Sequence, residues 1–169
     1  MLTNSAASCC TARRAASALS KGPAGECCAR RYARGVETID SLALGIHVKL
    51  VPTAEGGRAT PLLGGHEVGH RFTYRPNWGL PGWPDGDQTA APVLGFSRSN
   101  IAPGENARAI IVPLFREVGR WGDVNDGDEL RMYEGSRVCG RARVCWVRAA
   151  TWPMPLDEQD RLVQWLSSS

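Results

Sequence analysis

His66, Glu67 and His70 carry the most specific chemical pattern in the sequence, because together they fit H-E-x-x-H. On an α-helix, two histidines at this spacing lie one turn apart and can bind Zn²⁺, and the glutamate activates the bound water. The chemistry would be metal-assisted hydrolysis of a peptide bond. A zinc metallopeptidase is therefore one interpretation of the chain, with His66 and His70 as metal ligands.

The residues around this motif do not favour the helix that the chemistry needs. Glycines flank the motif and one lies inside it, and each costs a helix about 1 kcal/mol relative to Ala. No histidine follows His70, and neither Glu105 nor Glu117 lies on an evident second helix that could supply a third ligand. We therefore predict no catalytic residue, no metal and no cofactor, and we keep the metallopeptidase as the alternative.

The composition predicts one globular domain with some additional length. The chain has 169 residues, of which 43% are hydrophobic and 22% are charged. This length excludes a large multidomain enzyme. The longest apolar run covers residues 109–115, far short of the roughly 20 residues that cross a bilayer. We expect a cytoplasmic protein with no membrane partner.

The excess of basic over acidic residues lies at one end of the chain. Residues 1–35 carry six basic residues and one acidic residue (net +5), whereas the remainder carries 14 and 16 (net −2). Low hydrophobicity and high net charge predict a disordered basic extension over residues 1–35. That segment holds four of the six cysteines, whose spacing matches no common zinc or haem pattern: Cys9, Cys10, Cys27 and Cys28.

Residues 36–152 have the pattern of short strands joined by turns. Ile46, Val48 and Leu50 alternate with polar residues, and further strands are predicted over residues 93–96, 108–114, 130–133 and 137–147. Five or six antiparallel strands with one apolar face each must close or form a sandwich to bury that face. After Pro155 the period changes. Residues 153–169 are therefore predicted to hold a short helix over 157–166, with Asp157 as its N-cap.

Four short motifs occur along the predicted strands in a fixed order. They are Gly-Gly-Arg-Ala-Thr-Pro at 56–61, Tyr-Arg-Pro-Asn at 74–77, Ala-Pro-Gly-Glu-Asn at 102–106 and Glu-Gly-Ser-Arg-Val-Cys-Gly at 134–140. In this order they resemble the C-terminal domain of bacterial elongation factor Tu, over residues 45–147. The resemblance implies an all-β fold: a closed six-stranded antiparallel barrel of the translation-factor type. Three departures are the spacer 62–73, the elaborated loop 79–91, and Ala59, which stands where the family usually has histidine.

The resemblance implies binding rather than catalysis. No part of the sequence matches the phosphate-binding loop G-x-x-x-x-G-K-[ST], so the GTPase of the elongation factor has no counterpart in this chain. In the family this domain packs on the GTPase domain and touches the T stem of aminoacyl-tRNA. By resemblance the RNA-binding residues are Arg58, Asn77, Glu134 and Gly135, and the partners are tRNA or another structured RNA, or a GTPase or other protein.

A second set of basic residues is predicted from strand periodicity. Strict alternation along 137–147 puts Arg137, Arg141 and Arg143 on one face, together with Cys139 and Cys145. A row of arginines can follow a phosphate backbone. A merely solvated face is the alternative, since 18 of the 20 basic residues are arginine throughout. Six tryptophans could stack on bases or anchor loops and core: Trp78, Trp83, Trp121, Trp146, Trp152 and Trp165.

Overall fold

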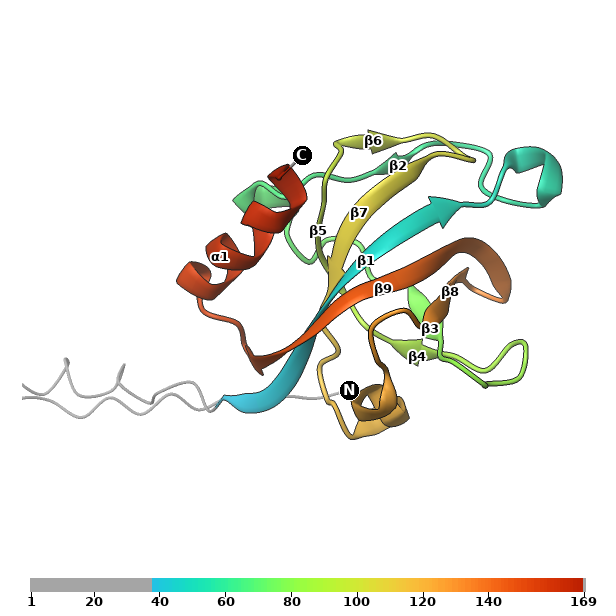
Figure 1. The fold of residues 1–169 in the computed structure, drawn as a ribbon. Coiled ribbons are helices and arrows are strands. Elements are labelled where there is room, and N and C mark those ends of the chain that lie inside the picture. The colour runs from blue at the N-terminus through green and yellow to red at the C-terminus, as the bar shows by residue number, and fades with distance from the viewer. Residues whose placement is uncertain (1–37, 169) are drawn as a thin grey trace, which may run out of the picture. The chain divides into compact units, whose positions relative to one another are not determined.

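The computed structural model describes residues 38–168, so the extension predicted at 1–35 lies outside the described residues. Figure 1 shows strands and short 3₁₀ turns followed by one α-helix. The elements are β1 (Ile39–Leu50), η2 (Thr53–Glu55), β2 (Leu62–Leu63), η3 (Val68–His70), β3 (Asn77–Gly79), β4 (Thr89–Ala90), β5 (Val93–Phe96), β6 (Asn100–Ile101), β7 (Asn106–Ile111), η4 (Val118–Asp123), β8 (Glu129–Glu134), β9 (Arg137–Trp152) and α1 (Leu156–Ser167). Within this part of the chain, no helix is long and apolar enough to cross a membrane.

Within residues 38–168, seven strands form one antiparallel sheet in the order β4-β3-β8-β9-β1-β7-β5, and β2 pairs separately with β6. The predicted antiparallel, strand-rich domain is thus confirmed. The long strands β1 and β9 lie side by side at the centre of the sheet (Figure 1). In β1 the apolar residues Ile46, Val48 and Leu50 are buried, whereas His47 and Lys49 are exposed, as their alternation predicts.

The predicted closure of the sheet into a barrel is wrong. The edge strands β4 and β5 are joined only by Ala91 and Pro92, yet no ladder of hydrogen bonds connects them. Residues 72–74, which lead into β3, form two backbone hydrogen bonds with Val93, from Phe72 N to Val93 O and from Val93 N to Tyr74 O. Pro76 and Pro92 lie at this seam, and neither has an N–H to extend the pairing. The sheet is therefore open.

Strict alternation along β9 is wrong at two positions. The register places Met132 opposite Gly140 and Tyr133 opposite Val138, so Cys139 is an extra residue in β9. In the same way, Gly45 is opposite Trp146 and Ile46 is opposite Val144, so Cys145 is a second extra residue. Each such bulge reverses the face on which the following side chains lie.

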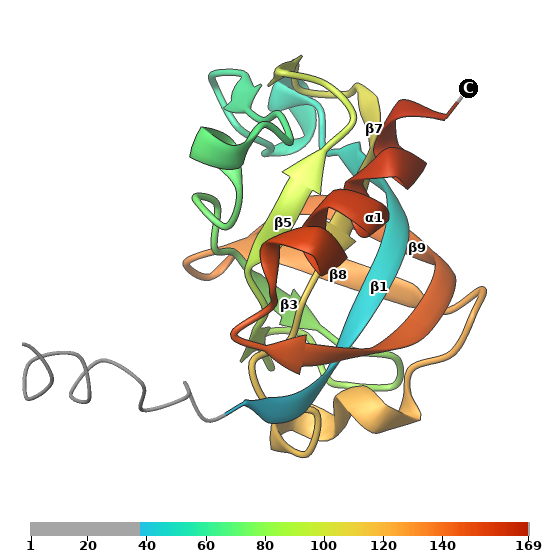
Figure 2. The same cartoon turned by 90° about the vertical axis from the view of Figure 1, so that its left-hand side faces the viewer.

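Two apolar clusters occupy the two sides of the sheet. The larger cluster includes Ile46, Trp78, Ile111 and Cys139. The smaller cluster is formed by Ala43, Leu94, Ile110, Val112, Ala150, Met154, Leu162, Val163 and Leu166. Helix α1 covers β5 and β7 from this second side (Figure 2). The predicted short helix is confirmed, but it begins at Leu156. Pro155 occupies the N-cap position, so Asp157 lies in the first turn, where its charge favours the helix dipole.

The contact between Gly45 and Trp146 generates a test of the second cluster. A Cβ atom on Gly45 would overlap the Trp146 indole, which also packs edge-on against Trp165 at 5.4 Å between ring centroids. Gly45→Ala should therefore lower the free energy of unfolding by about 1–3 kcal/mol, although Ala is normally preferred to Gly within a strand. Urea unfolding measures the change. Gly69→Ala, where no atom lies within 4 Å of the added Cβ, is the matched control and should change little.

Candidate functional site

The H-E-x-x-H segment does not form the helix that zinc binding requires. Glu67 has an extended backbone, and only a 3₁₀ turn, η3, follows it. The Nδ1 atom of His66 lies 3.1 Å from the carbonyl oxygen of Phe96, and the Nδ1 atom of His70 lies 3.0 Å from Glu67 Oε2. Both histidines and the glutamate are thus engaged by neighbouring protein atoms.

Glu67 acts as a local hydrogen-bond acceptor in this turn. Its Oε2 accepts from the backbone N–H of His66 at 3.1 Å, and the hydrogen bond with His70 lowers the pKa of Glu67 to about 2. Across residues 38–168, no three His, Cys, Asp or Glu side chains come together as metal ligands. The segment gives no structural support to the metallopeptidase interpretation.

Arg58 and Tyr74 both contact the carboxylate of Glu134. We call these three residues, together with Cys139, the Glu134 cluster. Glu134 Oε1 pairs with Arg58 Nη1 and accepts a hydrogen bond of 2.8 Å from the Tyr74 hydroxyl. The Tyr74 oxygen also lies 3.9 Å from Cys139 Sγ. The side chains of Arg58 and Glu134 are only 19% and 26% exposed, so the charge of Arg58 is neutralised within the protein.

Asn77 and Gly135 lie beside this cluster and are joined through one glutamine. Asn77 Nδ2 donates to Gln88 Oε1 at 3.1 Å, and Gln88 Nε2 donates to the carbonyl oxygen of Gly135 at 3.0 Å. The structure therefore brings together all four residues named by the resemblance. The side chains of Arg58, Asn77 and Glu134 each have a protein partner, and the charge of Arg58 is paired with that of Glu134.

The three arginines predicted to share one strand face are divided between two faces. Arg137 is opposite Glu134 and Arg141 is opposite Arg131. Since residues 131 and 134 are three apart on a regular strand, they lie on opposite faces. The bulge at Cys139 is the cause. Arg137 belongs beside the Glu134 cluster, with its Nη2 3.8 Å from Glu134 Oε2.

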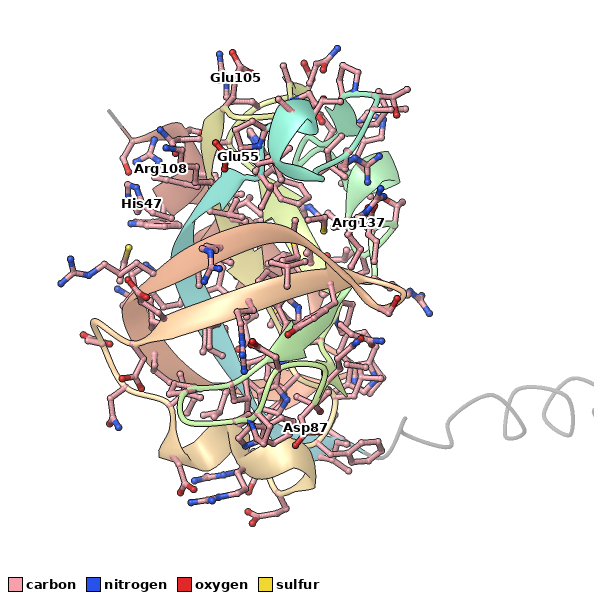
Figure 3. The ribbon with its side chains drawn as sticks, turned by 90° about the vertical axis from the view of Figure 1, so that its right-hand side faces the viewer. His47, Glu55, Asp87, Glu105, Arg108 and Arg137 are labelled. Carbon is pink, nitrogen blue, oxygen red and sulfur yellow. The ribbon has the colours of Figure 1, made fainter. Side chains whose placement is uncertain are left out.

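The outer face of β1 and β9 carries a compact group of cations. Arg141 is opposite Lys49, and Arg143 is opposite His47. Figure 3 shows this side of the domain, with His47 and Arg108 at one end and Arg137 at the other. Lys49, Arg141 and Arg143 are exposed, and no ion pair within residues 38–168 involves any of them. We call these three residues the basic face.

Arg131, next to Arg141, is not a free cation. Its side chain is 18% exposed, pairs with Asp85, and donates to the carbonyl oxygen of Pro84 at 3.2 Å. A hollow of about 200 Å³ lies between Lys49, Glu55 and Arg141. Of the neighbouring residues Lys49, Arg141 and Arg131, therefore, only Lys49 and Arg141 have no ion pair within residues 38–168.

Lys49 was not among the predicted binding residues. Its alternation with Val48 and Leu50 indicated an exposed position, but only the register of β1 against β9 shows that it faces Arg141. A strand register between segments some 90 residues apart has no local sequence signal. Alternation in the sequence indicates that Lys49 and Arg141 both point outward, but it does not indicate that they face each other.

The pair formed by Arg58 and Glu134 should contribute measurably to stability. Arg58→Ala removes the closer ion-pair partner of Glu134, and Glu134→Ala leaves the largely buried charge of Arg58 without its partner. Each change should cost about 1–3 kcal/mol of unfolding free energy. The double variant should lose less than the sum, with a coupling energy of about 1 kcal/mol by urea unfolding. The exposed pair Arg98 and Glu105, with side chains 49% and 42% exposed, is the control for the same measurement. Its coupling energy should be only a few tenths of a kcal/mol. A coupling as small as that of the control would contradict the assigned contact.

The Glu134 cluster should also make stability fall in alkaline solution. Burial raises the pKa of Tyr74 well above its ordinary value, and burial raises the pKa of Cys139 as well. A group whose pKa is raised on folding contributes its stability below its unfolded pKa, about 10 for tyrosine, and loses it as pH rises further. Unfolding free energies measured between pH 8 and pH 11 should therefore fall less steeply in Tyr74→Phe than in the unaltered protein. Equal slopes would contradict the assignment.

Comparison with known proteins does not identify a family. No family model matches the chain, and no curated protein matches it. The resemblance to the C-terminal domain of elongation factor Tu rests on the four motifs alone and stays a prediction. The structure shows what three of these motifs do in this chain: Arg58, Tyr74 and Glu134, one from each, contact one another.

Proposed function

We propose that residues 38–168 form a non-catalytic module that binds structured RNA, such as tRNA, through the basic face. The observation that carries the proposal is the group of three exposed cations on adjacent strands that no ion pair within the described residues neutralises. Like charges directly opposite on a sheet repel and lower stability. A polyanion on this face would attract these cations and so offset their mutual repulsion.

The arrangement suits a phosphate backbone better than a single anion. Arg141 and Arg143 are two residues apart on one face of β9, about 6–7 Å at the rise of a strand, and Lys49 is on the next strand. Cations at such intervals contact successive phosphates and carry little sequence information. The motifs shared with elongation factor Tu support a role in translation in the cytoplasm, with a GTPase subunit as a further partner. The RNA contact, however, is proposed on the basic face rather than at Arg58.

Salt dependence of tRNA binding tests the proposal. Fluorescence anisotropy with labelled tRNA should show binding at low salt that weakens as salt increases, with each phosphate contact adding about 0.7–0.9 to the slope of log K against log salt. Arg141→Gln and Arg143→Gln should each reduce the slope by about one contact. Arg161→Gln on α1, also exposed, is the matched control and should leave it unchanged.

The full 169-residue chain is used for every variant, because residues 1–35 carry a net charge of +5 that could itself attract RNA. That contribution is constant across the series, so differences between variants report the basic face. If tRNA does not bind at low salt, or if all three variants weaken binding equally, the RNA proposal fails. A protein partner, such as a GTPase domain, is then the better account.

A further inference from the structure

A hollow of about 340 Å³ lies directly beside the basic face. One wall is the loop 80–83, which contains Trp83, and the other is formed by Glu129, Arg131 and Arg141 of β8 and β9. Arg141 also lines the smaller hollow next to Lys49, so it stands between the two. The hollow is large enough for a planar ring, and the basic face reaches its rim.

The wall that carries Trp83 is held in place. Arg131 donates hydrogen bonds to the carbonyl oxygens of Trp83 and Pro84 and pairs with Asp85. The backbone N–H of Trp83 donates to the carbonyl oxygen of Leu80 at 3.1 Å. Trp83 is half-buried against the larger apolar cluster and also lines a second hollow, of about 50 Å³. Its position is therefore fixed, yet part of its indole is not covered by protein.

We propose that this hollow binds an unpaired nucleotide of the RNA, with its base against the indole of Trp83 and its phosphate on Arg141. The proposal rests on the proposed RNA-binding function. Aromatic side chains stack on any exposed base, and guanidinium groups bind phosphate oxygens. A base inside a duplex cannot enter, because its faces are already stacked. The hollow thus favours RNA with a bulged or looped-out base.

Glu129 gives the hollow a preference among bases. An ionised carboxylate only accepts hydrogen bonds, so it favours a base edge that carries N–H donors. Guanine offers two adjacent donors, N1–H and the N2 amino group, which match the two oxygens of one carboxylate, whereas uracil offers one donor flanked by two acceptors. Glu129 is exposed and opposite Arg143 in the register, at the edge of the basic face. We therefore expect guanine to be preferred over uracil.

Three RNA hairpins with identical stems test this inference: one with a single bulged guanosine, one with a bulged uridine, and one fully paired. The full chain should bind the guanosine bulge about tenfold more tightly than the paired stem at equal salt, as expected for one stacked base. Trp83→Leu should abolish that preference and leave the affinity for the paired stem unchanged. Glu129→Gln should reduce the ratio between guanosine and uridine bulges and leave the salt slope unchanged.

If Trp83→Leu does not fold, a fluorescence measurement on the unaltered protein tests the inference instead. 2-Aminopurine placed at the bulge should lose fluorescence when the unaltered protein binds, because its ring stacks on an indole. Unchanged fluorescence on binding would overturn the inference. If all three hairpins bind equally and Arg141→Gln still weakens their binding, the inference about the hollow fails but the proposed binding of RNA to the basic face stands. If no hairpin binds at low salt, both the hollow and the proposed function fail.

Discussion

The faces presented by β9 depend on two extra residues in that strand, Cys139 and Cys145. Because side chains of a strand alternate, each extra residue reverses the order of inward and outward positions. Arg137, before the first bulge, lies beside Glu134, and Arg141, after it, lies on the outer face. After the second bulge Trp146 joins the cluster that α1 covers. One strand thereby supplies the Glu134 cluster, the basic face and both apolar clusters.

The Glu134 cluster explains why three of the four motifs are informative about packing. Arg58, Tyr74 and Glu134 come from segments up to 76 residues apart, and the first two both contact the carboxylate of the third. Removing any one of them takes a hydrogen-bond or ion-pair partner away from a largely buried polar group, which costs more than the interaction itself contributes. The motif residues are thus constrained by one another. In this chain the motif residues therefore hold together segments that are far apart in the sequence.

Local patterns in the sequence predicted what local physics determines. The alternation in β1 and the change of period after Pro155 correctly indicated a strand and a helix, since burial on one face leaves a periodic trace. The bulges leave no such trace, and Arg137 was therefore placed on the wrong face. H-E-x-x-H illustrates the opposite case: the residue types match a zinc motif, but the glycines around it disfavour a helix, and the backbone at Glu67 is extended. The open seam of the sheet involves Pro76 and Pro92, whose effect appears only once the neighbouring segments at the seam are known.

The repulsion between the cations of the basic face is small compared with the free energy that holds β1 and β9 together. Lys49 and Arg141 face each other across one pair of the ladder between β1 and β9, and a like-charged pair on a surface costs a few tenths of a kcal/mol. That ladder runs along the whole of β1, from Ile39 to Leu50, and the apolar residues of its other face are buried in the larger cluster. Burial of one such side chain contributes roughly 1.5–3 kcal/mol, so the sheet tolerates unneutralised charge at this position without loss of its fold. The stability of the sheet therefore does not exclude exposed cations from this position.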